Sequence, residues 1–340
     1  MGGSPRATTR AFYVQSAGLV IANRAQRGFS REGLGVALGS VFEGALQRRR
    51  YHALREPRGR QLLITCDIGG SQKDQRYETF AFLIHDLDRS QLWLSGQRHL
   101  RSAVMRHHRR MAFKAMNDRL RRQALIPFLE LAEHLDGFLV TFAVDKSARP
   151  NMALDDEVHA DLATVWKASV IPRLTWIAYL GAFLISGFAA VGQDVMFILD
   201  EDEVAANVPQ LTKLTHFFAQ VCASHGGPMM GHLRCGTAKS DDGSLQLEDL
   251  VALPDLAAGA SAEFLWTLDR DGAGIMSPLL QHLPKALSWK SRMIMPWLLH
   301  EGGSLDRILC IVDGGSTATK WRATIPRYYT VNPQIALVGA

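Results

Sequence analysis

An acidic residue follows a run of strand-forming residues early in the chain. Gln61–Cys66 is rich in Leu, Ile and Thr and leads directly into Asp67, with Gly69 and Gly70 close behind. A buried strand that ends in a carboxylate places that charge at the edge of a sheet, where a ligand can reach it. The glycines allow the chain to turn and a bound group to come close. Asp67 is therefore the first candidate for a functional carboxylate, although an ordinary Asp-Gly turn has the same composition.

Two later acidic residues follow apolar runs in the same way. Asp145 comes directly after Phe138–Val144, and Asp200 comes directly after Asp194–Leu199. If both runs are strands parallel to the first, the three carboxylates meet at one edge of the sheet. Each residue also has an ordinary interpretation, because Asp145 precedes Lys146 as in a local ion pair and Asp200 opens an acidic turn.

A fourth acid lies in a segment with helical character, residues 247–264. Asp255 follows Pro254. Proline is tolerated in the first turn of a helix, where an acid also faces the positive end of the helix dipole. We therefore expect the helix to open near Pro254 and to hold Asp255 across the sheet edge. Asp249 is the alternative acid in this segment.

Carboxylates gathered at one edge predict a cation site. Such groups repel one another unless a cation lies between them, and hard oxygen ligands in this number suit Mg²⁺ or Mn²⁺. Two such ions about 4 Å apart are the usual arrangement for in-line phosphodiester cleavage. In this hypothesis Asp67 bridges two ions, Asp200 and Asp255 each hold one, and Asp145 supports them. Lys114 is the candidate for stabilising transition-state charge, although a lysine on a helix is also an ordinary surface charge.

The remaining apolar runs predict the strands that carry these acids. Residues 61–67, 77–85 and 91–95 are separated by turn-rich segments, which favours an antiparallel meander. Residues 138–144 and 194–199 are expected to join beside the first strand as its parallel neighbours. Two further strands are expected at residues 229–235 and 307–313.

Helical periodicity connects these strands. Pro127 is a candidate break within the helical segment that follows the meander, Gly137 a candidate C-cap and Pro172 a second break. The predicted helices span residues 36–55, 103–135, 155–192, 209–224 and 247–264.

This order of elements predicts an α/β protein with a ribonuclease H-like fold. The sheet is expected to be mixed, with a three-strand meander plus two parallel strands, and to be flanked by helices. The predicted core covers residues 61–265. Residues 1–60 form an N-terminal elaboration and residues 266–340 a C-terminal one, within one domain.

The charge of the chain is modest overall but clustered. The 340 residues include 38 basic and 33 acidic ones, a net charge of +5, which matters only where it is concentrated. Basic clusters predict contact with the backbone of a nucleic acid, although each cluster is also typical of a solvated helix face. The predicted contact residues are Arg48, Arg49, Arg50, Arg109, Arg110, Arg121 and Arg122. The terminal segments are candidates for contact with a second protein or a second copy of the chain.

The cysteine pattern and the start of the chain favour a cytoplasmic location. The four cysteines stand far apart without a Cys-x-x-Cys motif, so no disulfide framework or zinc site is predicted. The N-terminus is polar and lacks an apolar signal segment. Leu174–Gly192 contains 19 uncharged residues, nearly the length of a membrane span. Its glycines and polar residues favour a core helix, so no membrane contact is expected.

The chain resembles a large family of prokaryotic ribonuclease H-like proteins known as a domain of unknown function (DUF3800). The resemblance spans roughly residues 60 to 265, and the Asp-Leu-x-Ala-Gly motif is its most specific part, which favours Asp255 over Asp249. It implies a metal-dependent nuclease. The matching segments are Ile64–Asp67, Phe113-Lys114, Val144-Asp145-Lys146, Leu199-Asp200-Glu201 and Asp255-Leu256-Ala257-Ala258-Gly259.

The sequence leaves two other functions open. The family continues its first strand as Asp-Glu-Ser-Gly where this chain has Asp67-Ile68-Gly69-Gly70. The missing second acid favours a catalytically degenerate module that binds nucleic acid or protein. Cys66–Ser71 and Val312–Lys320 also resemble the glycine-rich turns of sugar kinases and actin-like ATPases, in which backbone N–H groups hold phosphate. The second alternative is therefore a phosphotransferase.

Overall fold

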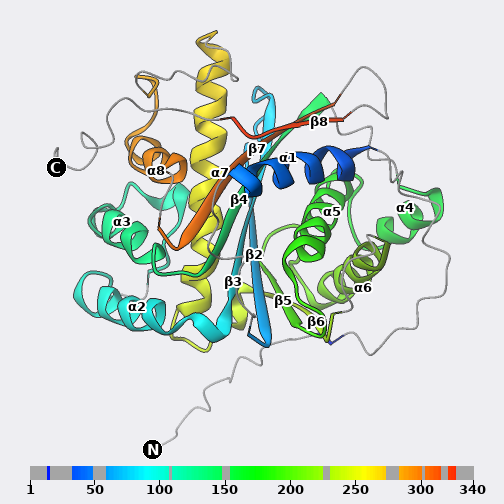
Figure 1. Cartoon of the computed structure of the whole chain (residues 1–340), viewed down its shortest axis with the longest axis horizontal. Helices are drawn as coiled ribbons and strands as arrows, with labels where there is room; N and C mark the ends of the chain where they lie inside the picture. The colour runs from blue at the N-terminus through cyan, green and yellow to red at the C-terminus, as the bar shows by residue number, and fades with distance from the viewer. Residues whose placement is uncertain are drawn as a thin grey trace, which may run out of the picture.

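The described part of the chain forms a layered α/β structure. The computed structural model describes residues 14–15, 33–48, 59–106, 109–147, 154–224, 230–272, 283–300, 303–314 and 321–326. A mixed sheet lies in the middle, with α2, α3, α7 and α8 covering one face and α1, α4, α5 and α6 the other (Figure 1). Each face therefore has its own apolar core.

The elements follow one another in strands and helices of ordinary length. The strands are β1 (Val14–Gln15), β2 (Gln61–Gly69), β3 (Tyr77–Asp86), β4 (Gly137–Asp145), β5 (Asp194–Leu199), β6 (Leu233–Thr237), β7 (Leu305–Gly314) and β8 (Trp321–Thr324). The helices are α1 (Leu34–Arg48), α2 (Gln91–Ala103), α3 (Arg119–Ala132), α4 (Asp156–Ala163), α5 (Ile171–Phe188), α6 (Val208–Ser224), α7 (Gln246–Arg270) and α8 (Trp289–Leu299), with a 3-10 turn η4 at Phe113–Ala115.

The sheet has the strand order β1-β6-β5-β2-β3-β4-β7-β8. β2, β3 and β4 form an antiparallel meander, while β5 lies parallel to β2 and β6 parallel to β5. β7 lies parallel to β4 and pairs with the antiparallel strand β8. The carboxyl ends of β2, β4, β5, β6 and β7 consequently share one edge of the sheet.

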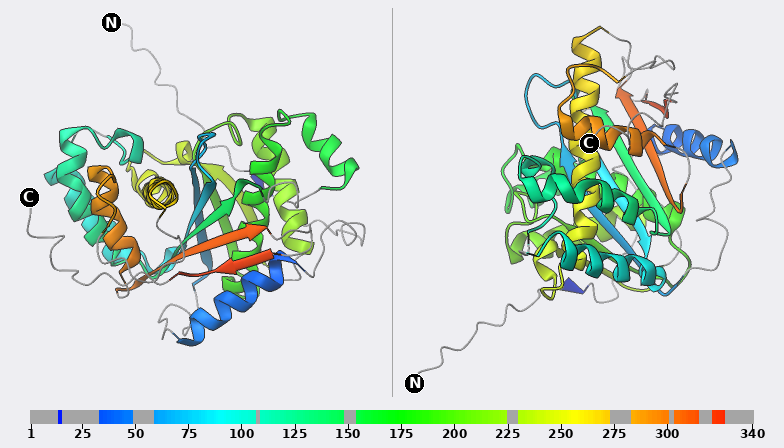
Figure 2. Two further views of the ribbon diagram at one scale, coloured as in Figure 1. Left: turned by 90° about the horizontal axis from the view of Figure 1, so that it is seen from above. Right: turned by 90° about the vertical axis from the view of Figure 1, so that its left-hand side faces the viewer.

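Alternation along the strands decides which core each side chain joins. In β2, Leu62 and Ile64 belong to the core under α5, whereas Leu63 belongs to the core under α7. Because successive strand residues point to opposite faces, Thr65 and Asp67 lie on the α7 face with Leu63. Figure 2 shows α7 running along this face.

The predicted meander is correct in kind but wrong in its third strand. Residues 91–95 lie in helix α2, and the third strand is β4, which pairs with β3 and not with β2. The buried face of α2 consists of Trp93, Gln97 and Leu100. Their spacing of three to four residues is helical, and five residues are too few to reveal that period.

Two predicted breaks near α3 are also wrong. Pro127 lies inside α3, which continues through it as one helix. Gly137 does not cap that helix but begins β4, opposite His85. Glycine is needed there because a side chain would collide with the backbone oxygen of Ile84. The predicted helix at residues 103–135 is therefore confirmed only for its second half, where α3 begins at Arg119.

Helix α7 is longer than predicted and begins earlier. It starts at Gln246, so Pro254 lies inside the helix and Asp255 lies in its middle. The expected interaction of Asp255 with the positive end of the helix dipole is therefore wrong. The other strands and helices lie where the sequence predicts them within a few residues: β2, β3, β5, β6, β7, α5 and α6. The predicted helix at residues 36–55 is found as α1 up to Arg48, and the rest of its range lies outside the described residues.

Helix α5 packs as a core helix. Ile171–Phe188 is apolar and long enough to cross a membrane, with a mean hydropathy of 1.3, but 72% of it is buried inside the protein. It packs on the sheet beside α6, and Trp176 contacts Phe80 of β3 at a ring distance of 6.4 Å. Pro172, predicted as a break within residues 155–192, lies in the first turn of α5, after the segment that separates α5 from α4.

We predict that Gly69 is needed for α7 to approach β2. An added Cβ would lie 2.6 Å from both the Ala258 carbonyl oxygen and the Thr79 hydroxyl. Gly69→Ala should lower the free energy of unfolding by about 1–3 kcal/mol, the usual cost of overpacking. Urea denaturation measures this change. Gly39→Ala in α1 is the matched control, because no atom lies within 4 Å of its added Cβ and alanine favours helix. Equal stability of the two variants would contradict the close approach.

Candidate active site

Asp67 and Asp200 lie side by side at the carboxyl edge of two parallel strands. In the pairing of β2 with β5, Cys66 lies opposite Leu199, so the next residue on each strand is one of these two acids. Met196 and Ile198 belong to the α7 core, and strand alternation extends that side of β5 toward Asp200. Both carboxylates are half-buried.

Helix α7 brings the third carboxylate, Asp255, to the same level. The Thr65 hydroxyl donates to the Leu250 carbonyl at 3.2 Å, and the Thr79 hydroxyl donates to the Ala258 carbonyl at 2.9 Å. From Leu250 to Ala258 the helix rises about 12 Å. Thr79 pairs with Gly69 of β2, and Thr65 to Gly69 spans about 13 Å of that strand. Helix and strand therefore stay in step.

Pro254 explains why the helix accepts this contact. Proline has no N–H, so the carbonyl four residues earlier in a helix loses its usual partner. That carbonyl belongs to Leu250, and the Thr65 hydroxyl supplies the missing hydrogen bond. The proline inside α7 thus leaves the Leu250 carbonyl free to accept from β2, two residues before Asp67.

The carboxylates interact strongly through their charges. Burial raises the pKa of Asp67 well above its usual value, and the nearby charge of Asp255 raises it further, against a hydrogen bond from the Ile68 N–H. Asp200 and Asp202 add to the same effect. Burial also raises the pKa of Asp255, although the Phe113 N–H donates to its carboxylate at 2.6 Å. The fold therefore concentrates negative charge that it does not fully neutralise.

Arg110 is the cation in direct contact with this cluster. Its guanidinium donates to Asp200 through both terminal nitrogens, one of them at 3.0 Å. Burial opposes ionisation of Asp200, but these hydrogen bonds and the charge of Arg110 hold its pKa below the usual value. The Arg110 carbonyl in turn accepts from Arg121 Nε at 2.8 Å. The arginine that the sequence assigned to nucleic-acid contact therefore lies inside the acidic site.

Lys114 lies beside the cluster and is exposed. Its charge lowers the pKa of both Asp200 and Asp255. It belongs to η4, whose Phe113 N–H holds Asp255. Gly259 permits this contact, because a Cβ there would overlap the Phe113 ring. The two sequence motifs around Lys114 and Asp255 are thus packed against each other.

Asp145 lies in a separate cluster. Strand β3 separates β4 from β2, so the ends of these two strands are not neighbours. Asp145 accepts from Arg76 Nε at 2.8 Å, and the same guanidinium lies 3.7 Å from Asp313 and 3.9 Å from Asp269. Asp145 and Asp67 are therefore not brought together. The prediction failed for this residue because it treated β4 as a direct neighbour of β2.

The competing acid Asp249 is a structural residue. It is buried and accepts from Arg101 Nε and Gln97 Nε2, each at 2.8 Å. These contacts tie α7 to α2.

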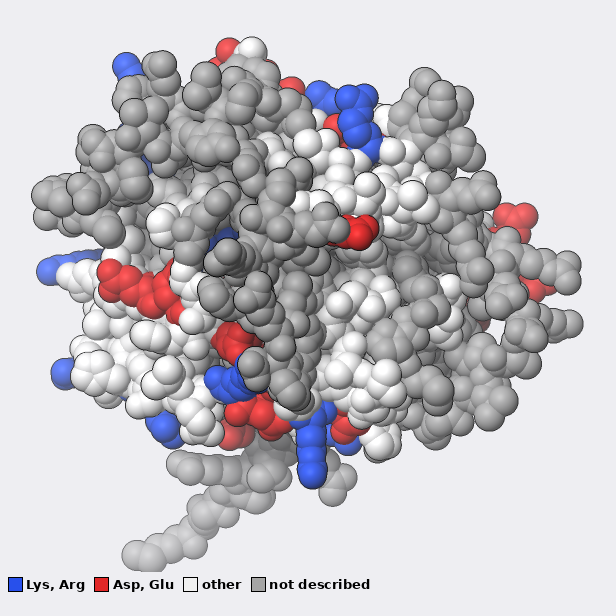
Figure 3. Space-filling model, in the orientation of Figure 1, with Lys and Arg blue, Asp and Glu red and all other residues white. Residues whose placement is uncertain are grey.

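The other predicted basic residues make local contacts. Arg109 pairs with Asp118. Arg122 Nε donates to the Met116 carbonyl at 3.2 Å, and its guanidinium lies over the Trp289 ring. Arg49, Arg50 and the Arg48 side chain lie outside the described residues. In Figure 3, the described charges visible on one face of the protein are mixed in sign.

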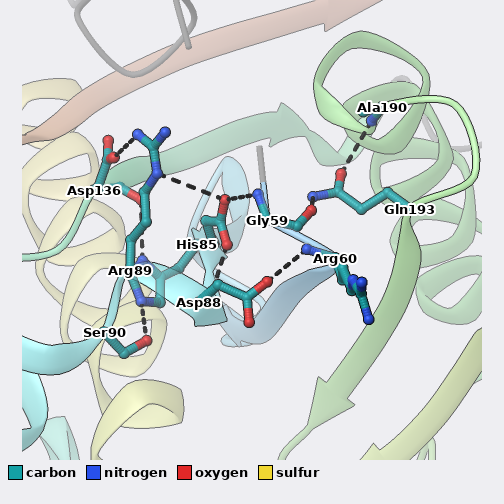
Figure 4. A network of polar contacts seen from close by, with 10 residues as sticks. Gly59, Arg60, His85, Asp88, Arg89, Ser90, Asp136, Ala190 and Gln193 are labelled. Carbon is teal, nitrogen blue, oxygen red and sulfur yellow. Dashed lines mark hydrogen bonds and ion pairs between the residues drawn. The ribbon is translucent and has the colours of Figure 1, made fainter. Parts of the chain in front are cut away.

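A serine–histidine pair at the opposite edge of the sheet has a structural role (Figure 4). His85 Nδ1 lies 3.0 Å from the Asp136 backbone oxygen and Nε2 lies 2.7 Å from Ser90 Oγ. A carbonyl only accepts, so Nδ1 carries the proton. Burial lowers the pKa of His85 and favours its neutral form, so Nε2 accepts from Ser90. Both side chains are buried, out of reach of a substrate.

The described residues contain no group of three or more His, Cys, Asp or Glu side chains arranged to hold a metal ion. In the candidate site, Arg110 and the Phe113 N–H bind carboxylate oxygens that an ion would otherwise use. No family model, curated protein or solved structure matches the chain. The family resemblance therefore stays a prediction.

We predict that the charge of Asp67 destabilises the fold in the absence of divalent cations. A raised pKa contributes stability that is fully present below the unfolded value, about 3.9, and lost as the pH rises through the folded value. Asp67→Asn stays neutral and keeps an acceptor for the Ile68 N–H. It should be more stable than the wild type at about pH 8, and the difference should vanish toward about pH 4.

Urea denaturation in EDTA across this pH range measures the difference. Asp145→Asn is the matched control with the opposite sign. Arg76 and the Ser147 N–H hold the pKa of Asp145 below its usual value despite its burial, so this variant should be less stable than the wild type at neutral pH. An Asp67→Asn protein less stable than the wild type at about pH 8 would contradict the electrostatic picture.

Proposed function

We propose that the chain has a ribonuclease H-like core. The supporting observation is the strand order β4-β3-β2-β5-β6, in which an antiparallel meander is followed by two strands parallel to its first member. Helices α5 and α6 precede the fourth and fifth strands of this set, and α7 follows them. In this proposal α2 and α3 are an insertion within the meander, and β7 and β8 extend the sheet.

We further propose that the protein hydrolyses phosphodiester bonds of nucleic acid with Mg²⁺ or Mn²⁺. The observation that carries this proposal is the convergence of Asp67, Asp200 and Asp255 from two strands and one helix. Divalent cations bound there would activate water and stabilise charge on the phosphate. Asp67 and Asp255 fit such an ion, because burial raises their pKa values by disfavouring the charged carboxylate, and a bound cation would offset that cost.

Arg110 and Lys114 complete the proposed site. Asp200 becomes available as a ligand when the Arg110 guanidinium leaves it, and a released arginine is suited to bind phosphate. Lys114 is exposed beside the carboxylates and would contact the phosphate undergoing cleavage. Arg110 would therefore bind either Asp200 of the acidic site or a phosphate of the substrate.

We predict that Asp67→Asn or Asp255→Asn abolishes Mn²⁺-dependent cleavage of nucleic acid. Each change removes a charged ligand, and we expect a loss of at least about 100-fold. Gel assays on single- and double-stranded DNA and RNA measure the rates. Asp145→Asn should retain cleavage per folded molecule, because Arg76 holds this residue in another cluster. Full activity of Asp67→Asn would remove this residue from the mechanism.

The alternative function is a module that binds nucleic acid without cleaving it. The ion pair between Arg110 and Asp200 favours this alternative, because it neutralises one of the three carboxylates without any metal. Binding would then depend on basic side chains and weaken steeply with salt.

Metal binding to an Arg110 variant distinguishes the two functions. We predict that Arg110→Gln binds Mn²⁺ roughly tenfold more tightly than the wild type, because Asp200 loses its competing cation; tenfold corresponds to about 1.4 kcal/mol. Isothermal titration calorimetry measures the affinity. Arg109→Gln is the matched control, because that arginine pairs with Asp118 instead. Absence of Mn²⁺ binding in both the wild type and Arg110→Gln would favour the module that does not cleave.

The phosphotransferase alternative has less support. The β2–β3 hairpin does carry Gly69 and Gly70 at its turn, and Gly70 has a positive φ of 72°. However, the space beside Gly69 is filled by the Ala258 carbonyl oxygen and the Thr79 hydroxyl. A phosphate would meet these acceptors there and not open space.

A further inference from the structure

Trp289 is an exposed aromatic side chain at the beginning of α8. It is 42% exposed, and it is the one aromatic among the large apolar side chains that lie exposed in the described residues. The Arg122 guanidinium lies 5.4 Å from the centre of its ring. Arg122 is fixed by its hydrogen bond to the Met116 carbonyl. The guanidinium thus covers one face of the indole, and both side chains are open to solvent.

This surface is connected to the acidic site through two contacts. Lys290 Nζ donates to the Phe113 carbonyl at 3.0 Å and lies 3.7 Å from the centre of the Phe113 ring. The N–H of the same Phe113 donates to Asp255. Exposed Lys114 is the next residue along the chain. Basic side chains therefore extend from Trp289 to the carboxylates.

The start of α8 is held rigidly on α7, which it crosses in Figure 2. Ser288 caps α8, and its hydroxyl and that of Ser291 donate to Glu263 at 2.8 and 2.7 Å. Glu263 lies eight residues beyond Asp255 on α7, a rise of about 12 Å. The tryptophan is thus presented at a fixed distance from the acidic site, which lowers the entropy lost when a ligand binds.

We propose that Trp289 and Arg122 form a stacking platform for single-stranded nucleic acid that leads toward the acidic site. This inference rests on the proposed function and specifies its substrate class. An indole offers a flat face on which an unpaired base can stack, and the neighbouring basic side chains would contact the phosphate backbone of the nucleic acid. Bases inside a duplex are already stacked on one another, so the platform selects a single strand. Lys114 and Lys290 lie on the path to the carboxylates.

Fluorescence polarisation with labelled oligonucleotides tests the platform. The full chain is titrated in EDTA against single-stranded thymidine and uridine oligonucleotides and against a duplex of equal length. Trp289→Ala should weaken single-strand binding about tenfold, within the usual effect of removing a stacking aromatic, and change duplex binding little. Trp289→Phe keeps a planar ring and should retain most of the affinity. Trp266→Ala is the matched control, because Arg270 lies over that ring in a similar way, at 4.8 Å.

The outcomes separate the platform from the nuclease. Wild-type affinity of Trp289→Ala, or an equal loss for single strand and duplex, overturns the platform and leaves the nuclease proposal standing. Absence of nucleic-acid binding by the wild type overturns both. A selective loss with Trp289→Ala in a chain that cleaves nothing supports the platform and overturns the nuclease.

Discussion

The hydrogen bond from the Thr65 hydroxyl to the Leu250 carbonyl fixes α7 against the central strand, and the candidate site depends on it. The carbonyl needs this donor because Pro254 cannot supply one. A second hydrogen bond, from Thr79 to Ala258, and the absence of a side chain at Gly69 keep the helix close over the next turns. Backbone polar groups, satisfied by two threonines, therefore determine how near Asp255 comes to the sheet.

The electrostatic character of the site follows from this packing. The helix holds a carboxylate against two others, where burial and mutual repulsion raise the pKa of Asp67 and Asp255. Arg110 neutralises only part of the negative charge of the three carboxylates, since it forms its ion pair with Asp200. The same sheet edge carries a second acidic group around Arg76, and there the guanidinium lies among the carboxylates. Arg76 compensates the negative charge of its carboxylates more completely than Arg110 compensates that of Asp67, Asp200 and Asp255. This difference favours the group around Asp67 as a cation site.

The sequence predicts the parts of the fold that depend on local pattern. The apolar runs that become β2, β3, β4 and β5 are long and well bounded, and the acids at their ends are visible directly. The sequence does not predict which strands become neighbours, because that depends on how the helices pack. The expected strand at residues 91–95 filled the third position of the meander. The sequence therefore predicted β4 beside β2, and Asp145 in the same cluster as Asp67. Pro254 suggested a helix start for the same reason, because the donor for the Leu250 carbonyl comes from the Thr65 hydroxyl, 185 positions earlier in the chain. The pairing of Arg110 with Asp200 joins segments 90 residues apart, and no local spacing indicates it.

Crystals of the protein soaked in Mn²⁺ would test the central claim most directly, through the anomalous scattering of the ion. The account predicts a peak about 2.1 Å from carboxylate oxygens of both Asp67 and Asp255, with the Arg110 guanidinium displaced from Asp200. Anomalous maps without a peak at these residues at millimolar Mn²⁺, or with a peak only beside Asp145 and Asp313, would contradict it.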